Sequence, residues 1–219
     1  MADVPPARIS HRRPVVDAAG AAAGMCLFAL LVHSEWPWNL ASAAGLILAA
    51  DAVWHSFQTE GAPGIAIGLS PLCRKVALWL VPGCLLGMAL GVLFRVVSGT
   101  GALPAGVGQF VLVAAAIGAV EELVFRGFVQ GRLRQLGWPA AVVLAAAAHT
   151  AYKSALFAAP PAGVEIDHVF LAVWTLIGGV AFGLLRQGSG SVLPPLAAHV
   201  AFDVVVYGEL AQAPWWVWS

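Results

Sequence analysis

Six of the ionisable residues in the apolar second half of the chain have types and spacing that could support hydrolysis. They are Glu121, Glu122 and Arg126 in one apolar run, His149 in the next, and His199 and Asp203 in a later one. A charged side chain inside a bilayer costs at least about 2.5 kcal/mol, so such residues are read as candidate functional sites. We therefore interpret the six residues as a catalytic site built inside a membrane.

The residue types suit a reaction that uses activated water. Hydrolysis requires a base that takes a proton from water and a group that stabilises the oxyanion. Glu121 or Glu122 can supply the base, and His149 can share or orient the water. His199 and Asp203 are four residues apart, which places them on one helix face. They can hold the substrate carbonyl or orient each other. Arg126 follows Glu122 by four residues and can pair with it on the same helix.

The same side chains are also possible metal ligands. Zinc binds histidine nitrogen and carboxylate oxygen and keeps one position open for water in catalytic sites. Glu121, His149 and His199 therefore form a possible zinc site, with ligands from three separate segments because HExxH is absent. Metal-bound water and water activated by glutamate and histidine both remain open on these residues.

Composition indicates an integral membrane protein. Of 219 residues, 60% are hydrophobic and only 10% are charged, with a mean hydropathy of +0.86. A soluble domain carries about 25% charged residues. The formal net charge is zero, so no basic face indicates nucleic acid as a partner.

The apolar runs predict an all-α, polytopic bundle of transmembrane helices. About 20 apolar residues span a bilayer, and the backbone of a span must satisfy its own hydrogen bonds, which favours helices. We predict a cytoplasmic tail at 1–15 and a single integral membrane domain at 16–219, with the motif-bearing core at about 105–210. Seven spans are expected, at roughly 16–33, 38–57, 75–97, 105–127, 139–157, 169–186 and 192–211.

The distribution of basic residues predicts the orientation of these spans. With the N-terminus inside, only Arg95 and Lys153 of the eleven lysines and arginines fall in outer segments. Cytoplasmic segments are enriched in these residues, which supports a cytoplasmic N-terminus. This topology brings Glu121, His149 and His199 to similar depths in the inner half of the membrane.

The spacing of these residues resembles a known family. The pattern Glu-Glu-x-x-x-Arg at 121–126, a histidine at 149 in the next span, and His-x-x-x-Asp at 199–203 in a later one are similar to the CPBP (CAAX protease and bacteriocin-processing, also called Abi) family. That family includes the Rce1-type prenyl-protein endopeptidases. The resemblance covers roughly residues 105–210, and it implies an intramembrane endopeptidase.

The resemblance also implies roles for individual residues. Glu121 and His149 would activate water, while His199 and Asp203 would support the oxyanion or orient the site. The chain departs from the family at two positions: Ala145 replaces a phenylalanine four residues before His149, and Asp203 replaces an asparagine. An ionised aspartate cannot donate a hydrogen bond, whereas an amide can.

We expect the protein to hydrolyse a peptide bond of a membrane-associated protein or peptide, close to its C-terminus, in a bacterial inner membrane. The host's prenylation system, the substrate and the oligomeric state are not encoded in these motifs. Two other functions are compatible with the same residues. One is a non-catalytic membrane binding or immunity protein of the same fold. The other is a proton-coupled carrier, in which buried glutamate and histidine relay protons; carriers usually contain repeats, and none is visible.

Overall fold

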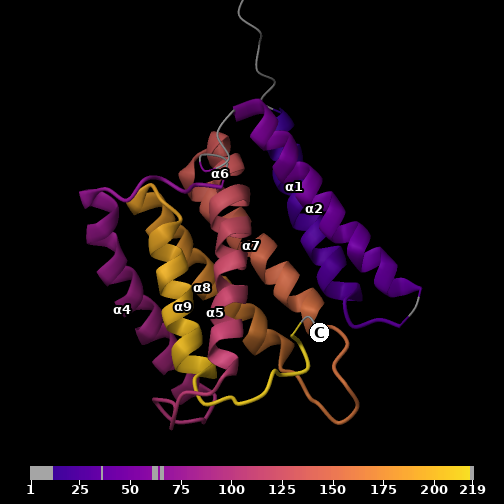
Figure 1. Ribbon diagram of the computed structural model, residues 1–219, viewed down its shortest axis with the longest axis vertical. Coiled ribbons are helices and arrows are strands. Elements are labelled where there is room, and N and C mark those ends of the chain that lie inside the picture. The colour runs from indigo at the N-terminus through magenta and orange to yellow at the C-terminus, as the bar shows by residue number, and fades with distance from the viewer. Residues whose placement is uncertain (1–11, 36, 61–63, 65–66, 218–219) are drawn as a thin grey trace, which may run out of the picture.

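A computed structural model describes residues 12–35, 37–60, 64 and 67–217 (Figure 1). The first eleven residues of the predicted N-terminal tail lie outside the described residues. The described part of the chain contains helices and no strands, so the all-α prediction is confirmed. The helices are α1 (Arg12–Leu31), α2 (Trp38–Glu60), α4 (Arg74–Val97), α5 (Phe110–Glu122), η1 (Leu123–Val129), α6 (Gln130–Leu133), η2 (Arg134–Leu136), α7 (Trp138–Leu156), α8 (His168–Ser189) and α9 (Leu193–Tyr207).

Each predicted span overlaps one helical segment of the described chain, with α5, η1 and α6 following one another without a break. Among the described residues, three helices are long and apolar enough to cross a membrane by length and composition: α1 from Arg13, α4 and α8. The apolar helix α9 is shorter. Seven helical segments are therefore observed among the described residues, while seven membrane crossings stay a prediction.

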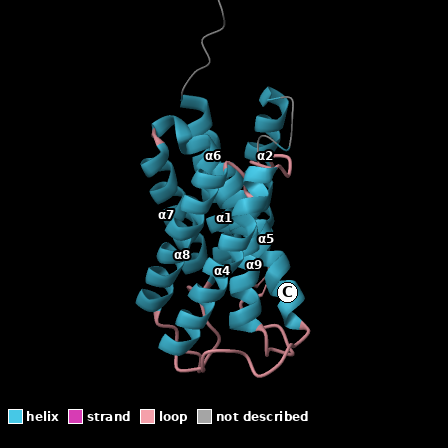
Figure 2. Ribbon diagram, turned by 90° about the vertical axis from the view of Figure 1, so that its left-hand side faces the viewer, coloured by secondary structure: helices cyan, strands magenta, loops and turns pink. Residues whose placement is uncertain are grey.

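The helices run roughly side by side along the long axis of the molecule (Figure 2). In Figure 1, α1 and α2 form a pair along one side, and α4 lies at the opposite side against α9. Between them, α9 also packs on α5, and α7 packs on both α8 and α1. The motif-bearing helices α5, α7 and α9 thus lie in the interior of the arrangement.

Glycines on α4 allow its close approach to α9. Gly83, Gly87 and Gly91 recur every fourth residue and are buried. A Cβ atom on Gly87 would collide with the carbonyl oxygen of Ala198 on α9. Small residues permit such close helix packing where lipid provides no hydrophobic driving force.

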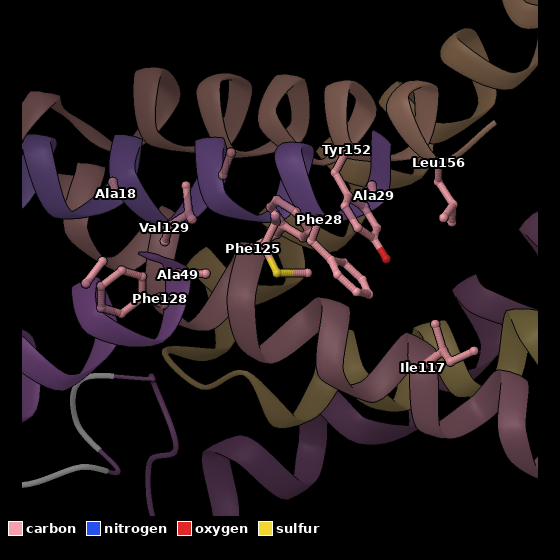
Figure 3. Packing of buried hydrophobic residues seen from close by; sticks show 14 of the residues in the cluster. Ala18, Phe28, Ala29, Ala49, Ile117, Phe125, Phe128, Val129, Tyr152 and Leu156 are labelled. Atoms are coloured by element: carbon pink, nitrogen blue, oxygen red, sulfur yellow. The ribbon is translucent and has the colours of Figure 1, made fainter. Parts of the chain in front are cut away.

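Aromatic side chains pack the π-helical segment η1 between its neighbours. Figure 3 shows Phe28 of α1 and Tyr152 of α7 beside Phe125 of η1. The rings of Phe125 and Tyr152 have centroids 5.5 Å apart, and both side chains are fully buried. This packing fixes the segment that immediately follows the two glutamates.

The surface is apolar and the interior holds charges, the reverse of a soluble protein. Ile47, Leu112 and Val169 are each more than two-thirds exposed, whereas Arg126 is 1% exposed. Large exposed apolar surfaces mark contact with membranes or partners. The arrangement is the one expected for helices that face lipid and enclose a polar centre.

The helix that carries the glutamates is longer than the predicted 105–127 span. It begins at Phe110 and continues through η1 and α6 to Leu133, so Glu121 and Glu122 lie near its middle. It continues because Gln130, four residues after Arg126, is buried and its Nε2 donates to the carbonyl of Gly183 at 2.9 Å. A hydropathy pattern places such residues at the end of a span, whereas their pairing keeps them inside.

Candidate active site

The structure brings all six predicted residues into one buried cluster. Glu121 and Glu122 end α5, Arg126 lies in η1, His149 lies in α7, and His199 and Asp203 lie in α9. None is more than 7% exposed, and both glutamates have no exposed surface. The π-helical turn at Leu123–Val129 follows the glutamates directly; such turns occur frequently at functional sites.

Both carboxylate oxygens of Glu121 are contacted by side chains of α7. Its Oε2 lies 3.0 Å from Nε2 of His149. Its Oε1 lies 2.6 Å from the ammonium of Lys153. On α9, Nε2 of His199 lies 3.9 Å from Oε2.

Arg126 determines which ring nitrogen of His149 carries the proton. Its Nη1 lies 2.9 Å from Nδ1 of His149. A guanidinium only donates hydrogen bonds, so Nδ1 accepts and the ring proton is carried by Nε2. His149 therefore donates from Nε2 to Glu121. The ring also packs against Phe125, with centroids 4.7 Å apart, and stacks with Tyr152.

The chain lacks the phenylalanine that the family has four residues before His149, and another aromatic side chain packs against the histidine. Ala145 stands at that position and is 1% exposed. The contact with the His149 ring comes instead from Phe125, on the helix that carries the glutamates. An aromatic neighbour is thus supplied to the histidine from η1.

Glu122 holds the second histidine. Its Oε1 accepts from Nδ1 of His199 at 2.8 Å and lies 3.0 Å from Nη1 of Arg126. Because Nδ1 is used, Nε2 of His199 faces the other carboxylates, at 3.9 Å from Oε2 of Glu121 and 3.9 Å from Oδ1 of Asp203. These distances are too long for direct hydrogen bonds, but an oxygen atom between the groups could bridge them.

A glycine on α5 makes room for α9. A Cβ atom on Gly118 would collide with Oδ2 of Asp203 and lie 3.0 Å from Cδ2 of His199. Gly118 is one turn before the glutamates, so the absence of a side chain there admits the His199–Asp203 pair. Sequence reasoning did not identify this residue.

A cavity of about 110 Å³ adjoins the cluster. Its polar wall consists of Arg126, His149, Lys153, His199 and Asp203. The remaining wall is mainly apolar and comes from α4, α7, α8, α9 and the C-terminal segment: Leu90, Phe94, Phe157, Leu171, Trp174, Thr175, Gly178, Gly179, Phe182, Phe202, Tyr207 and Trp216. The site thus combines a charged end with a cavity suited to an apolar group.

Lys153 is the functional candidate that sequence reasoning missed. Counting basic residues assigned it to an outer segment, but it lies in α7 and contacts Glu121. One signal could have identified it: Lys153 follows His149 by four residues, which places both on the same helix face. Sequence alone could not show that this face points toward a glutamate.

Residues 103–205 match the Rce1-like family model, whose description is "Type II CAAX prenyl endopeptidase Rce1-like". The matched segment contains all six predicted site residues and Lys153, and the predicted resemblance is confirmed over it. The match supports a CAAX-type intramembrane endopeptidase in general and, together with the apolar helices, a membrane protein. Neither the comparison with curated proteins nor that with solved structures finds a match.

Proposed function

We propose that this chain, with its Rce1-like segment, is an intramembrane endopeptidase that hydrolyses a peptide bond near the C-terminus of a membrane-associated protein or peptide. One observation carries the proposal. Glu121 lies 3.0 Å from His149 and 3.9 Å from His199, and both histidines line a cavity with apolar walls. The proposed base thus lies next to two histidines that border space for a substrate.

Glu121 is the general base in this proposal. Each carboxylate oxygen can accept two hydrogen bonds, so Glu121 can bind a water in addition to His149 and Lys153. The gap between its Oε2 and Nε2 of His199 is where we place that water. Since His149 already donates to Glu121 and accepts from Arg126, we assign it the orientation of Glu121 rather than proton abstraction.

His199 and Asp203 are assigned to the substrate carbonyl. Both line the cavity, and His199 Nε2 is the ring atom not engaged by Glu122. The Nδ1–H of His199 already donates to Glu122. A second hydrogen bond donated from Nε2 therefore requires the imidazolium form of His199. A donor aimed at the developing oxyanion is worth about 10²- to 10³-fold in rate.

The step balances without a further reactant. The water oxygen forms a bond to the carbonyl carbon while one water proton passes to Glu121. The tetrahedral intermediate then collapses, the carbon–nitrogen bond breaks, and the proton moves from Glu121 to the leaving amine. The products are a carboxylic acid and a free amine.

The observed donor atoms do not suit a zinc ion. Nε2 of His149 carries its proton toward Glu121 and therefore has no lone pair for a metal. The ammonium of Lys153, 2.6 Å from Glu121, adds like charge where a cation would bind. Within the described residues, no three histidine, cysteine, aspartate or glutamate side chains are grouped to hold a metal. These contacts support activation of water by Glu121 itself, which predicts activity that resists chelators.

The cavity supports a substrate with a bulky apolar group near the scissile bond. Its wall includes Gly178 of α8, where an added Cβ would meet no atom within 4 Å. Gly178→Leu should therefore fill the cavity without disturbing the helix packing. We expect this variant to lose cleavage of substrates with bulky apolar groups first.

The proposed setting is a bacterial inner membrane with a cytoplasmic N-terminus. The excess of lysine and arginine in the predicted inner segments supports this orientation. The partners are then the lipid bilayer and a membrane-associated protein or peptide substrate.

The test uses the purified full chain in lipid vesicles. Peptides ending in Cys-aliphatic-aliphatic-X, with and without a prenyl group, are incubated with wild type, Glu121→Gln, His149→Ala and His199→Ala, and mass spectrometry identifies the new termini. Glu121→Gln should lower the rate by about 10²- to 10⁴-fold. Glu165→Gln, at an exposed glutamate in the loop before α8, is the matched control and should match wild type.

Two results would count against the proposal. Equal cleavage by Glu121→Gln would remove the assigned base. If wild type releases no new terminus from these peptides or from the membrane proteins of its host, a binding or immunity role takes its place; pH-gradient-dependent flux would instead favour a carrier.

A further inference from the structure

We propose that Lys153 is a positioning residue, whose ammonium holds the Glu121 carboxylate ionised and in place opposite His149. This inference rests on the proposed function and adds a residue outside the motifs. It also assigns a purpose to a cation that lines the charged end of the cavity.

The contact is short and enclosed. Lys153 Nζ lies 2.6 Å from Oε1 of Glu121, whose side chain has no exposed surface, while that of Lys153 is 17% exposed. Lys153 and His149 are one turn apart on α7, and each reaches a different oxygen of the carboxylate. One hydrogen-bond donor, His149, and one ammonium, Lys153, from the same rigid helix therefore hold the two oxygens of the carboxylate.

The charges of the cluster are balanced in pairs. Glu122 lies 3.0 Å from Arg126, and Lys153 is the lysine whose ammonium contacts Glu121 directly, at 2.6 Å. A buried carboxylate without a cation or hydrogen-bond donors is driven toward its neutral form. The titratable or charged side chains that face Glu121 are Glu122, Arg126, His149, Lys153, His199, Asp203 and Tyr207.

Aromatic rings hold the ammonium at the cavity. Nζ of Lys153 lies 5.8 Å from the ring centroid of Tyr152 and 5.8 Å from that of Trp216. Cations are attracted to aromatic faces at these distances. The C-terminal segment, through Trp216, thereby completes the surroundings of the base from outside the matched family segment.

Lys153 takes no part in the proton transfers of the proposed reaction. Its charge favours Glu121 as a carboxylate at the start of the cycle, and the water proton passes to Glu121 alone. Loss of the ammonium should therefore lower the fraction of enzyme with an ionised base, and it should leave substrate binding nearly unchanged.

The experiment compares wild type, Lys153→Met, Lys153→Gln and Lys153→Arg in lipid vesicles. For each protein, kcat and KM are measured across pH for the same Cys-aliphatic-aliphatic-X peptides. Lys75→Met, at the exposed start of α4, is the matched control because Lys75 is the chain's other lysine. We expect Lys153→Met to lower kcat by about 10- to 100-fold, a fraction of what a general base contributes. KM should change by less than about twofold, since uniform binding is not affected. The acidic limb of the pH–activity profile should move to higher pH.

Lys153→Arg should restore most of kcat and the wild-type acidic limb, because it keeps the charge. Thermal unfolding of each variant identifies the folded proteins, and Lys153→Gln serves for comparison if Lys153→Met does not fold.

Three outcomes would overturn the inference. A folded neutral variant with wild-type kcat and pH profile shows that the ammonium does not act on Glu121. A change confined to KM assigns Lys153 to substrate binding instead. A wild-type protein that cleaves nothing overturns the proposed function and this inference together, so the two failures are distinguishable.

Discussion

Nδ1 of His199 lies 2.8 Å from Oε1 of Glu122, although 77 residues separate them along the chain. Glu122 also pairs with Arg126 at 3.0 Å, and Arg126 in turn contacts His149. One carboxylate without exposed surface thereby connects both histidines of the site. Glu122 is thus placed to orient the catalytic groups, while Glu121 is placed to act on water.

Substitution of Glu122 should separate its structural role from its orienting role. Glu122→Leu leaves Arg126 buried without its carboxylate, and breaking a buried pair in this way costs about 3–5 kcal/mol of stability. Glu122→Gln keeps the shape and one acceptor, so it should fold but lose activity by about 100-fold through misplacement of His199. Thermal unfolding and peptide cleavage measure the two effects. A fully active Glu122→Gln variant would show that His199 does not need this carboxylate.

Asp203 offers a test of oxyanion support. Its Oδ1 is 3.9 Å from Nε2 of His199, and both side chains line the cavity. Asp203→Asn supplies an N–H donor at the same place, so we expect cleavage to be retained. Asp203→Leu removes all polar atoms and should lower kcat by about 10²-fold or more. If the asparagine variant is as inactive as the leucine variant, the negative charge of Asp203 is required.

Gly118 should be intolerant of even a methyl group. An added Cβ would collide with Asp203 Oδ2, so Gly118→Ala must displace the side chains of Asp203 and His199, at a cost of about 1–3 kcal/mol for an overpacked site. Both thermal stability and cleavage should fall. Gly131→Ala in α6 is the matched control, because its Cβ meets no atom within 4 Å. Equal behaviour of the two variants would contradict the tight contact.

The loop between α4 and α5 should loosen at low pH through Glu209. Hydrogen bonds from the backbone N–H of Ala105 and from Arg95 lower the pKa of Glu209 below its ordinary value. A lowered pKa means that the stabilisation is present above the unfolded value and is lost as pH falls through the folded one. Below about pH 4, where glutamate ordinarily titrates, hydrogen exchange of residues 98–109 should accelerate relative to its intrinsic rate.

The control for this prediction is Glu209→Gln, which removes the titrating group. Its loop should exchange faster at neutral pH and show no further step on acidification. An acid-induced step that persists in Glu209→Gln would place the titrating group elsewhere.

The number of membrane crossings can be tested by labelling. Cys26, Cys73 and Cys84 are first replaced, and a single cysteine is placed at Arg134 or at Glu165, both exposed and on either side of α7. Seven spans predict that membrane-impermeant reagents label the two positions from opposite sides, with Arg134 inside. Labelling of both from one side would contradict the topology, because α7 would not cross.

The sequence by itself determined the helices and the chemical types in the site. Apolar runs of span length mark the helices, since hydropathy and length are local properties of the chain. Charges such as Glu121 and His149 stand out against those runs because they are costly there. Their order along the chain also sufficed for the resemblance to Rce1-like endopeptidases, which the matched segment confirms.

Only the tertiary structure decided which of these groups touch. Three contacts are made between different helices: the ion pair of Lys153 with Glu121, the hydrogen bond of His199 with Glu122, and the close approach of α9 to Gly118. Such contacts depend on how helices rotate and cross, which is set by packing over the whole bundle. The same reason explains the length of the α5–η1–α6 helix. Hydropathy predicted an end near residue 127, but His149 contacts Arg126 and Gly183 accepts from Gln130, and these contacts with other helices allow the helix to continue.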